Sequence, residues 1–216
     1  MPESMEHSIA RGVEAFGTSW RPERAATAPG RLELLGNHVD YNGGLVLAGA
    51  IDRTIRAVSG TGTAQAGRIR LHAPDVSTDV ETVVCDTPAP PDPDGVTTPG
   101  GYLAGIVQAL NEAELPVRCG QDIVVSGDVP VGFGMSSSAA LCVSLTLLIS
   151  ETRLDPKRLV AIARRAEHIT GAPVGAMDQS ASVAGGVILF DGTTADVTRL
   201  DPDLGDHVFA VANSGV

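Results

Sequence analysis

A glycine-rich turn between an expected strand and an expected apolar helix restricts how this chain folds more than any other feature. The strand is predicted over residues 121–130, QDIVVSGDVP, and the helix over residues 136–151, which begin SSSAALCV. Between them lies VGFGM, whose Gly132 and Gly134 permit backbone angles that other residues avoid. The helix carries no charge before its last residue, which predicts that it is buried.

The turn also has the composition of a phosphate-binding loop. A helix N-terminus carries a partial positive charge and unpaired N–H groups, so it binds anions. Small residues let a phosphate chain approach the backbone, and Ser136, Ser137 and Ser138 add hydroxyl donors. The Walker pattern is absent and Lys157 is the only lysine, so a metal ion or an arginine must supply the countercharge. The alternative is a plain helix cap, because serine is a favoured N-cap.

The rest of the chain predicts an α+β fold, with strands and irregularly interleaved helices rather than strict βαβ alternation. Residues 87–101, TPAPPDPDGVTTPGG, have the composition of a surface loop. Further helices are expected over residues 5–16, 102–113 and 156–169, and further strands over residues 32–35, 44–60, 67–73, 79–86, 185–191, 195–200 and 207–214.

Charge and cysteine content narrow the function classes. The chain has 26 acidic and 15 basic residues, a net charge of −11, which disfavours nucleic acid and membrane surfaces as partners. No stretch of 18 apolar residues and no apolar leader occur in the sequence. Cys85, Cys119 and Cys142 are widely spaced and odd in number, so they are expected as buried thiols in a reducing compartment. A cytoplasmic location follows from these expectations.

A second polar segment, APGRLELLGNHVDYNGG at residues 28–44, places Arg31, His38, Asp40 and Asn42 between glycines. Hydrogen-bonding groups at this density suit a polyhydroxylated ligand. The alternative is a polar hairpin with DYNGG at its tip.

A third segment, residues 163–186, carries two carboxylates in a run of small residues. Glu167 lies late on the expected helix, and Asp178 follows a Gly-Ala-Met turn. A partly desolvated carboxylate is a good general base, and a second one suits Mg²⁺. The alternative is a solvated Glu167 and an Asp178 that caps a helix.

With these segments in this order, the chain resembles the GHMP family of small-molecule kinases, and within it the galactokinases. Residues 31–44 are similar to the galactokinase signature, residues 129–141 to the family's phosphate loop, and residues 166–179 to its A-E-H…G-x-M-D-Q segment. FAVANSGV, residues 209–216, is similar to the strand that follows in the family.

The resemblance implies an ATP-dependent kinase that phosphorylates the C1 hydroxyl of galactose. Asp178 would accept the proton of that hydroxyl, and Arg31 would stabilise the carboxylate and the transferred phosphoryl group. Ser138 and Glu167 would hold the Mg²⁺ cofactor. The loop that cradles the ATP phosphates would comprise Gly132, Phe133, Gly134, Met135, Ser136, Ser137 and Ser138.

The sugar would be bound by Asn37, His38 and Asp40, together with Asp178. Asn37 stands where galactokinases usually carry glutamate, and Glu33 where they usually carry asparagine. An amide offers fewer acceptor sites than a carboxylate. N-acetylgalactosamine, arabinose and glucuronate therefore stay open as substrates, as does a non-catalytic sensor of sugar and ATP.

The resemblance also implies that residues 1–216 form the N-terminal domain of a two-domain kinase, with a ribosomal-S5-like fold. The family's second domain, with another glycine-rich motif, would lie in a C-terminal half outside this chain. Because the family's active site lies between the two domains, residues 1–216 alone are expected to bind sugar and nucleotide weakly. The partners are then a small-molecule sugar, ATP and that C-terminal half.

Overall fold

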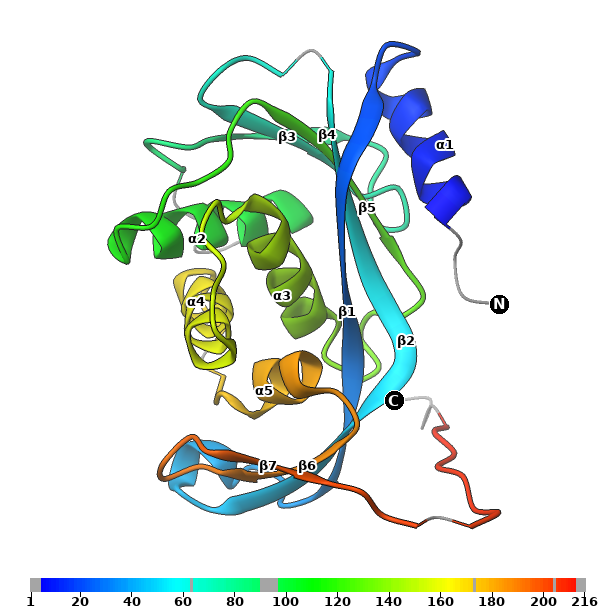
Figure 1. Ribbon diagram of the computed structural model, residues 1–216, viewed down its shortest axis with the longest axis vertical. Helices are drawn as coiled ribbons and strands as arrows, with labels where there is room; N and C mark the ends of the chain where they lie inside the picture. The colour runs from blue at the N-terminus through cyan, green and yellow to red at the C-terminus, as the bar shows by residue number, and fades with distance from the viewer. Residues whose placement is uncertain (1–4, 63, 90–96, 173, 204, 213–216) are drawn as a thin grey trace.

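The computed structural model describes residues 5–62, 64–89, 97–172, 174–203 and 205–212. Over these residues the chain forms one mixed seven-stranded sheet, with α2 to α5 on one face and α1 on the other (Figure 1). The predicted α+β class is confirmed. The helices are α1 (Met5–Phe16), α2 (Pro99–Glu112), α3 (Ser137–Ile149), α4 (Pro156–Ile169) and α5 (Met177–Ala184); the strands are β1 (Arg21–Leu35), β2 (Leu45–Thr61), β3 (Arg68–His72), β4 (Val80–Val84), β5 (Gln121–Gly127), β6 (Val187–Asp191) and β7 (Val197–Leu200).

Strand β2 organises the sheet, because both of its edges are paired. Strand β1 pairs antiparallel with one edge of β2 along nearly the whole length of β1. On the other edge of β2, residues 55–60 pair with β5 and residues 45–49 pair with β6. The order is β4-β3-β5-β2-β6-β7, and among the described strands only the pairing of β3 with β5 is parallel. The two long strands therefore connect the two ends of the molecule (Figure 1).

Strand β1 is much longer than the strand predicted at residues 32–35. Its first part contains Pro22 and Pro29, which are usually read as breaking a strand. In the described part of the chain β1 pairs only with β2, and an edge strand tolerates proline because one row of its N–H groups needs no partner. The pairing register shifts at both prolines, between Pro22 and Arg24 and between Pro29 and Arg31.

The predicted bounds of α1 and α4 are confirmed, whereas the predicted start of α2 is wrong. Helix α4 has the predicted bounds, with Asp155 as N-cap accepting a 2.9 Å hydrogen bond from the Arg158 N–H. Helix α2 starts three residues earlier than predicted, because Thr98 caps it and Pro99 occupies its first turn. Helix α5 was not predicted; it has only eight residues, too few to display a clear periodicity.

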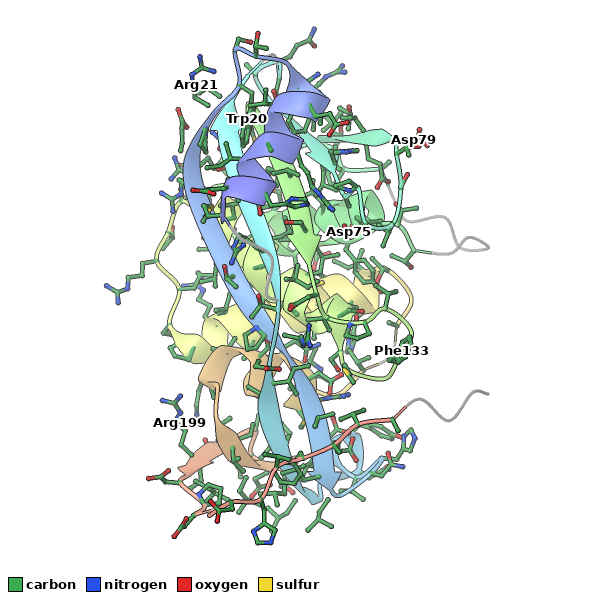
Figure 2. The ribbon with its side chains drawn as sticks, turned by 90° about the vertical axis from the view of Figure 1, so that its right-hand side faces the viewer. Trp20, Arg21, Asp75, Asp79, Phe133 and Arg199 are labelled. Carbon is green, nitrogen blue, oxygen red and sulfur yellow. A yellow bond between two sulfur atoms is a disulfide. The ribbon has the colours of Figure 1, made fainter. Side chains whose placement is uncertain are left out.

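Helix α3 is buried as predicted: ten of its 13 residues are buried, between the sheet and α2 and α4. On the opposite face, α1 covers Trp20, whose side chain is fully buried (Figure 2). A Cβ on Gly12 would lie 2.4 Å from the Trp20 ring, so the helix approaches the indole as closely as glycine allows.

Two of the three expected thiols form a disulfide, so that expectation was wrong for Cys85 and Cys119. Strand β3 pairs with β4 on one side and β5 on the other, which brings the residue after β4 close to the residues before β5. The two Cα atoms are 6.5 Å apart although 34 positions separate them in sequence. Cys142 is free and buried, as predicted.

The predicted strand at residues 207–214 is also wrong for residues 207–212; residues 213 and 214 lie outside the described residues. The segment pairs with no described strand, and Val208 is 86 % exposed. Its apolar sequence suits a strand, but a strand forms only where a neighbour supplies hydrogen bonds. Of the predicted loop at residues 87–101, residues 90–96 lie outside the described residues.

Candidate active site

The candidate site begins at the register shift in β1 between Pro29 and Arg31. A Cβ on Gly30 would lie 2.6 Å from the carbonyl oxygen of Met135, so glycine is required for the close approach of the two segments. The Arg31 N–H donates to that same oxygen at 3.1 Å. A bulge re-aims the following side chain, and here it directs Arg31 toward the loop before α3.

Arg31 and Asp178 form an ion pair across 147 positions of sequence. Arg31 Nε donates to Asp178 Oδ1 at 2.7 Å, and Arg31 Nη1 donates to the Gly134 carbonyl at 2.6 Å. The two side chains are 13 % and 22 % exposed, so the pair is largely shielded from solvent. Asp178 lies in the first turn of α5, as a carboxylate at a helix N-terminus should.

Ser136 forms a hydrogen bond with the second carboxylate oxygen of Asp178. Its Oγ donates to Asp178 Oδ2 at 2.6 Å. Although Ser136 is the N-cap residue of α3, its side chain makes no capping hydrogen bond. The plain helix cap, left open by the sequence, therefore does not describe this serine.

The loop before α3 is exposed and strongly curved. Gly132 and Gly134 have φ angles of 80° and 70°, which supports the reason given for two glycines there. Phe133 and Val131 on the loop are 49 % and 63 % exposed. Ser137 and Ser138 begin α3 and are partly buried.

Glu167 is buried beneath this loop, contrary to the reading of a solvated helix residue. Its side chain is on the inner face of α4, and the residue is 2 % exposed. Burial raises the pKa of Glu167, while hydrogen bonds from Ser138 and Gln179 act in the opposite direction. Asp178 lies close enough for its charge to raise this pKa further.

A cavity of about 600 Å³ opens beside Arg31 and Gly134. Its wall is formed by the end of β1 and the two residues after it, from Arg31 to Asn37, and includes Glu33. Asn37, predicted to contact the sugar, therefore lines the same cavity as the Arg31 side of the ion pair.

His38 and Asp40 are not among the residues that line this cavity. His38 Nδ1 lies 2.5 Å from the hydroxyl of Tyr41. The Asp40 carboxylate packs against Gly175, three residues before Asp178, where a Cβ would lie 1.7 Å from Asp40 Oδ2. The segment forms a hairpin turn between β1 and β2, as the alternative proposed, and also brings Asp40 toward the start of α5.

A second groove, of about 520 Å³, leads away from Ser137 and Ser138. Its walls are mostly apolar, formed by the start of α2, the end of β5 and the turn between β3 and β4. Asp75 and Asp79 line it, and both lie on the same side of the molecule as Phe133 in Figure 2.

Sequence reasoning missed three neighbours of the predicted residues. Gln179 donates to Glu167 and had a signal, since it belongs to the quoted M-D-Q motif. Tyr102 hydrogen-bonds Ser138, and burial raises its pKa; only the fold brings it there. Glu33 had been noted only as a departure from the galactokinase signature.

Neither a cluster of metal-binding side chains nor a membrane-spanning helix is found among the described residues. Among the described residues, no three His, Cys, Asp or Glu side chains are grouped so that they could hold a metal ion by themselves. Within the same part of the chain, every helix is too short or too polar to cross a membrane.

Comparisons with known proteins agree with this architecture. Residues 13–60 match the galactokinase galactose-binding signature, and residues 101–186 match the N-terminal domain of GHMP kinases. The chain is 38 % identical over 194 residues to the galactokinase of Streptomyces coelicolor, covering 86 % of this chain and 47 % of that protein. It is 36 % identical over 185 residues to the galactokinase of Actinobacillus succinogenes, covering 83 % and 47 %.

The fold is similar to the crystal structure of Lactococcus lactis galactokinase complexed with galactose, with a TM-score of 0.77. The sequence identity is 20 %, over 94 % of this chain and 53 % of that one. The chain spans about half the length of the curated relatives it matches.

The fold and the matched domain define an N-terminal domain of the kind found in GHMP kinases. The chain belongs to the GHMP kinase family, and the relatives reported above are galactokinases.

Proposed function

We propose that this chain is the sugar- and nucleotide-binding domain of an ATP-dependent kinase that phosphorylates galactose at its C1 hydroxyl. The observation that carries the proposal is the Asp178 carboxylate, held by Arg31 on one oxygen and by Ser136 of the phosphate loop on the other. A base, a cation and a phosphate loop in one hydrogen-bonded group are the parts that phosphoryl transfer requires.

Asp178 accepts the proton of the C1 hydroxyl as the sugar oxygen attacks the γ-phosphorus of ATP and ADP leaves. Each carboxylate oxygen accepts more than one hydrogen bond, so the bonds from Arg31 and Ser136 leave room for the substrate. Arg31 holds the carboxylate in place and places a positive charge beside the transferred group. The products are galactose 1-phosphate and ADP.

The nucleotide lies with its phosphates on residues 132–138 and its base in the groove of about 520 Å³ that starts at Ser137 and Ser138. The N–H groups at the start of α3 point toward the phosphates, and their partial charge favours anions. The apolar walls of the groove suit a flat base, because pockets for such ligands are mostly apolar with few polar groups.

Ser138 and Glu167 fit Mg²⁺. Their hydroxyl and carboxylate oxygens are the hard ligands that Mg²⁺ prefers, and Mg²⁺ uses one or two protein ligands beside phosphates and water. Glu167 is a buried carboxylate with a raised pKa, so a cation beside it would offset the desolvation of its charge. When bound, Mg²⁺ neutralises charge on the ATP phosphates.

The sugar occupies the cavity of about 600 Å³ along the end of β1. Asn37 lines this cavity, and Asp40 lies beside Gly175 at the start of α5. His38 would reach the sugar only after turning away from Tyr41. Since Asn37 and Glu33 both differ from the usual galactokinase residues, a related sugar such as N-acetylgalactosamine, arabinose or glucuronate is the second candidate substrate.

The proposal includes the wider context of the domain. Residues 1–216 form a GHMP N-terminal domain of ribosomal-S5-like fold in a cytoplasmic enzyme, although the disulfide between Cys85 and Cys119 removes the cysteines as an argument for that location. Relatives about twice as long support a second half that completes the site.

The proposal is tested with the protein as it occurs in its natural host, whose intact mass identifies the polypeptide to be assayed. Asp178→Asn should lower sugar-1-phosphate formation by roughly 10²- to 10⁴-fold, the effect of removing a positioned base. Asp196→Asn is the matched control, because Asp196 is also ion-paired, at 2.8 Å to Lys157, but is exposed and lines neither cavity. Near-parental activity of Asp178→Asn would refute the assignment.

The substrate is tested in the same assay with galactose, N-acetylgalactosamine, arabinose and glucuronate in competition. A preference for galactose supports the first candidate, and a preference for another sugar supports the second. Binding of both sugar and ATP without turnover would instead indicate a sensor. The intact Arg31–Asp178 pair argues against that outcome, because a sensor has no need of a base.

A further inference from the structure

Ser136 has a backbone conformation that serine seldom adopts. Its φ and ψ are 53° and 48°, in the left-handed region. Non-glycine residues avoid this region because Cβ approaches the following carbonyl oxygen, and glycine occupies it freely. Gly132 and Gly134 of the same loop show that the chain places glycine where φ is positive. A serine at this position therefore needs a reason that lies in its side chain.

The hydroxyl of Ser136 has a specific partner. Ser136 is the N-cap of α3, a position from which a serine hydroxyl usually accepts a hydrogen bond from the first turn, yet it makes none. It donates instead to Asp178 Oδ2 at 2.6 Å, while Arg31 Nε donates to Oδ1 at 2.7 Å. Two different elements thus hold the two oxygens, which fixes both the position and the plane of the carboxylate.

The loop is tied to the same arginine by its backbone. Arg31 Nη1 donates to the Gly134 carbonyl at 2.6 Å, and the Arg31 N–H donates to the Met135 carbonyl at 3.1 Å. With the bond from Ser136 to Asp178, three consecutive loop residues are linked to the ion pair. A change in the loop must therefore move the carboxylate, and the reverse also holds.

We propose that Ser136 is a positioning residue for Asp178, whose left-handed backbone aims its hydroxyl at the carboxylate and so couples the seating of the nucleotide phosphates to the orientation of the base. This inference rests on the proposed function, in which Asp178 accepts the substrate proton. It assigns the Ser136 hydroxyl to the base, whereas the hydroxyls of Ser137 and Ser138 stay with the nucleotide and the metal.

The test is Ser136→Gly, which removes the hydroxyl and relieves the backbone at once. We expect kcat to fall by between about ten- and hundredfold, the effect of a misplaced reacting group, with KM for sugar and nucleotide within about twofold of the parent. The melting temperature should not fall, because glycine suits the left-handed region. Ser136→Ala, which keeps the unfavourable backbone but lacks the hydroxyl, should lose kcat to the same extent.

Ala195 provides the matched control. It has a φ of 57° and lies exposed in the turn between β6 and β7, outside the loop before α3 and outside the residues that line the two cavities. Ala195→Gly makes the same backbone change, so it should raise the melting temperature slightly and leave kcat and KM unchanged.

Two results would overturn the inference. A higher KM for the nucleotide at unchanged kcat would make the hydroxyl a phosphate ligand, and parental kinetics in both Ser136 variants would leave it without a role. Asp178→Asn is measured beside them to separate the two proposals. If it is inactive while Ser136→Gly is unaffected, only the positioning role fails; if it is active, the proposed function fails and the positioning role with it.

Discussion

The ion pair between Arg70 and Asp122 offers the sharpest test of how α1 and β1 are held on the sheet. Arg70 Nε and Nη2 each donate to an oxygen of Asp122 at 2.7 Å, and the Asp122 side chain is fully buried. The guanidinium lies 5.1 Å from the centre of the Phe16 ring. The Trp20 indole N–H donates to the Asp122 backbone carbonyl at 3.2 Å. Asp122 on β5 therefore contacts both Arg70 on β3 and Trp20, which lies between α1 and β1.

Replacing Arg70 by methionine keeps most of the side chain's apolar contact and removes its charge. The Asp122 carboxylate then stays buried without its arginine, which typically lowers the free energy of unfolding by about 3–5 kcal/mol. The Arg70 side chain is 27 % exposed, so water partly replaces it, and we expect the lower end, about 3 kcal/mol.

Urea unfolding measures this effect, with Trp20 as the reporter, because it is the only tryptophan in the chain and hydrogen-bonds Asp122. Arg70→Met should lower the urea midpoint at an unchanged slope. Adding Asp122→Leu should restore much of the stability, since a buried pair replaced by apolar groups is often neutral. Lys157→Met, which breaks an ion pair of 80 % and 62 % exposed side chains, is the control and should leave the midpoint unchanged.

The reasoning is wrong if Arg70→Met unfolds at the parental midpoint, or if the double variant is less stable than Arg70→Met alone. The first result would mean that water or another hydrogen-bond donor satisfies the Asp122 carboxylate. The second would mean that the Asp122 side chain is required for backbone geometry and packing rather than for its charge.

Three other predictions concern buried groups. Burial raises the pKa of Glu167 above 4.5, so the native state binds its proton more tightly than the unfolded state, and the charged form lowers stability above that pH. Glu167→Gln should therefore melt higher than the parent at pH 7, with the difference disappearing as the pH falls toward 4.5; an equal difference at all pH values would contradict this. Gly12→Ala places a Cβ 2.4 Å from the buried Trp20 ring and should lower the free energy of unfolding by about 1–3 kcal/mol in the same urea assay. Alkylation of the denatured, unreduced protein should label Cys142 only, and labelling of all three cysteines would disprove the disulfide.

The bounds of α4 were predicted well because local chemistry sets its start. Asp155 and Pro156 mark the start of α4 whatever the rest of the chain does, because capping involves only neighbouring residues. Strand β1 was underestimated for the opposite reason. Whether Pro22 and Pro29 interrupt a strand depends on whether its free edge needs their N–H groups, and only the sheet order decides that.

In the candidate site, too, some features could be predicted from the sequence and others could not. The motifs pointed to Arg31, Asp178 and Glu167 as chemically suitable, and their roles stay predictions. The partner of each is a property of the fold: residues 42 positions apart make the bond from Ser136 to Asp178, and no local pattern encodes it. The disulfide was missed on the same ground, since β3 lies between the segments that carry its two cysteines.

The placement of local irregularities supports the location of the site independently of any motif. Conformations and groups that destabilise a fold persist where the surroundings fix them, and they gather at functional sites. Here the shifted register at Pro29, the left-handed Ser136 and the buried Glu167 all adjoin Arg31 and Asp178 or the loop beside them. Among the residues that the structure describes, the other left-handed non-glycine residues outside the 28–44 segment are Glu114 and Ala195, which lie in exposed turns, where such a conformation meets little constraint. Stabilising substitutions at Glu114 and Ala195 should consequently leave phosphoryl transfer unchanged. Stabilising substitutions at Pro29, Ser136 and Glu167 should impair it.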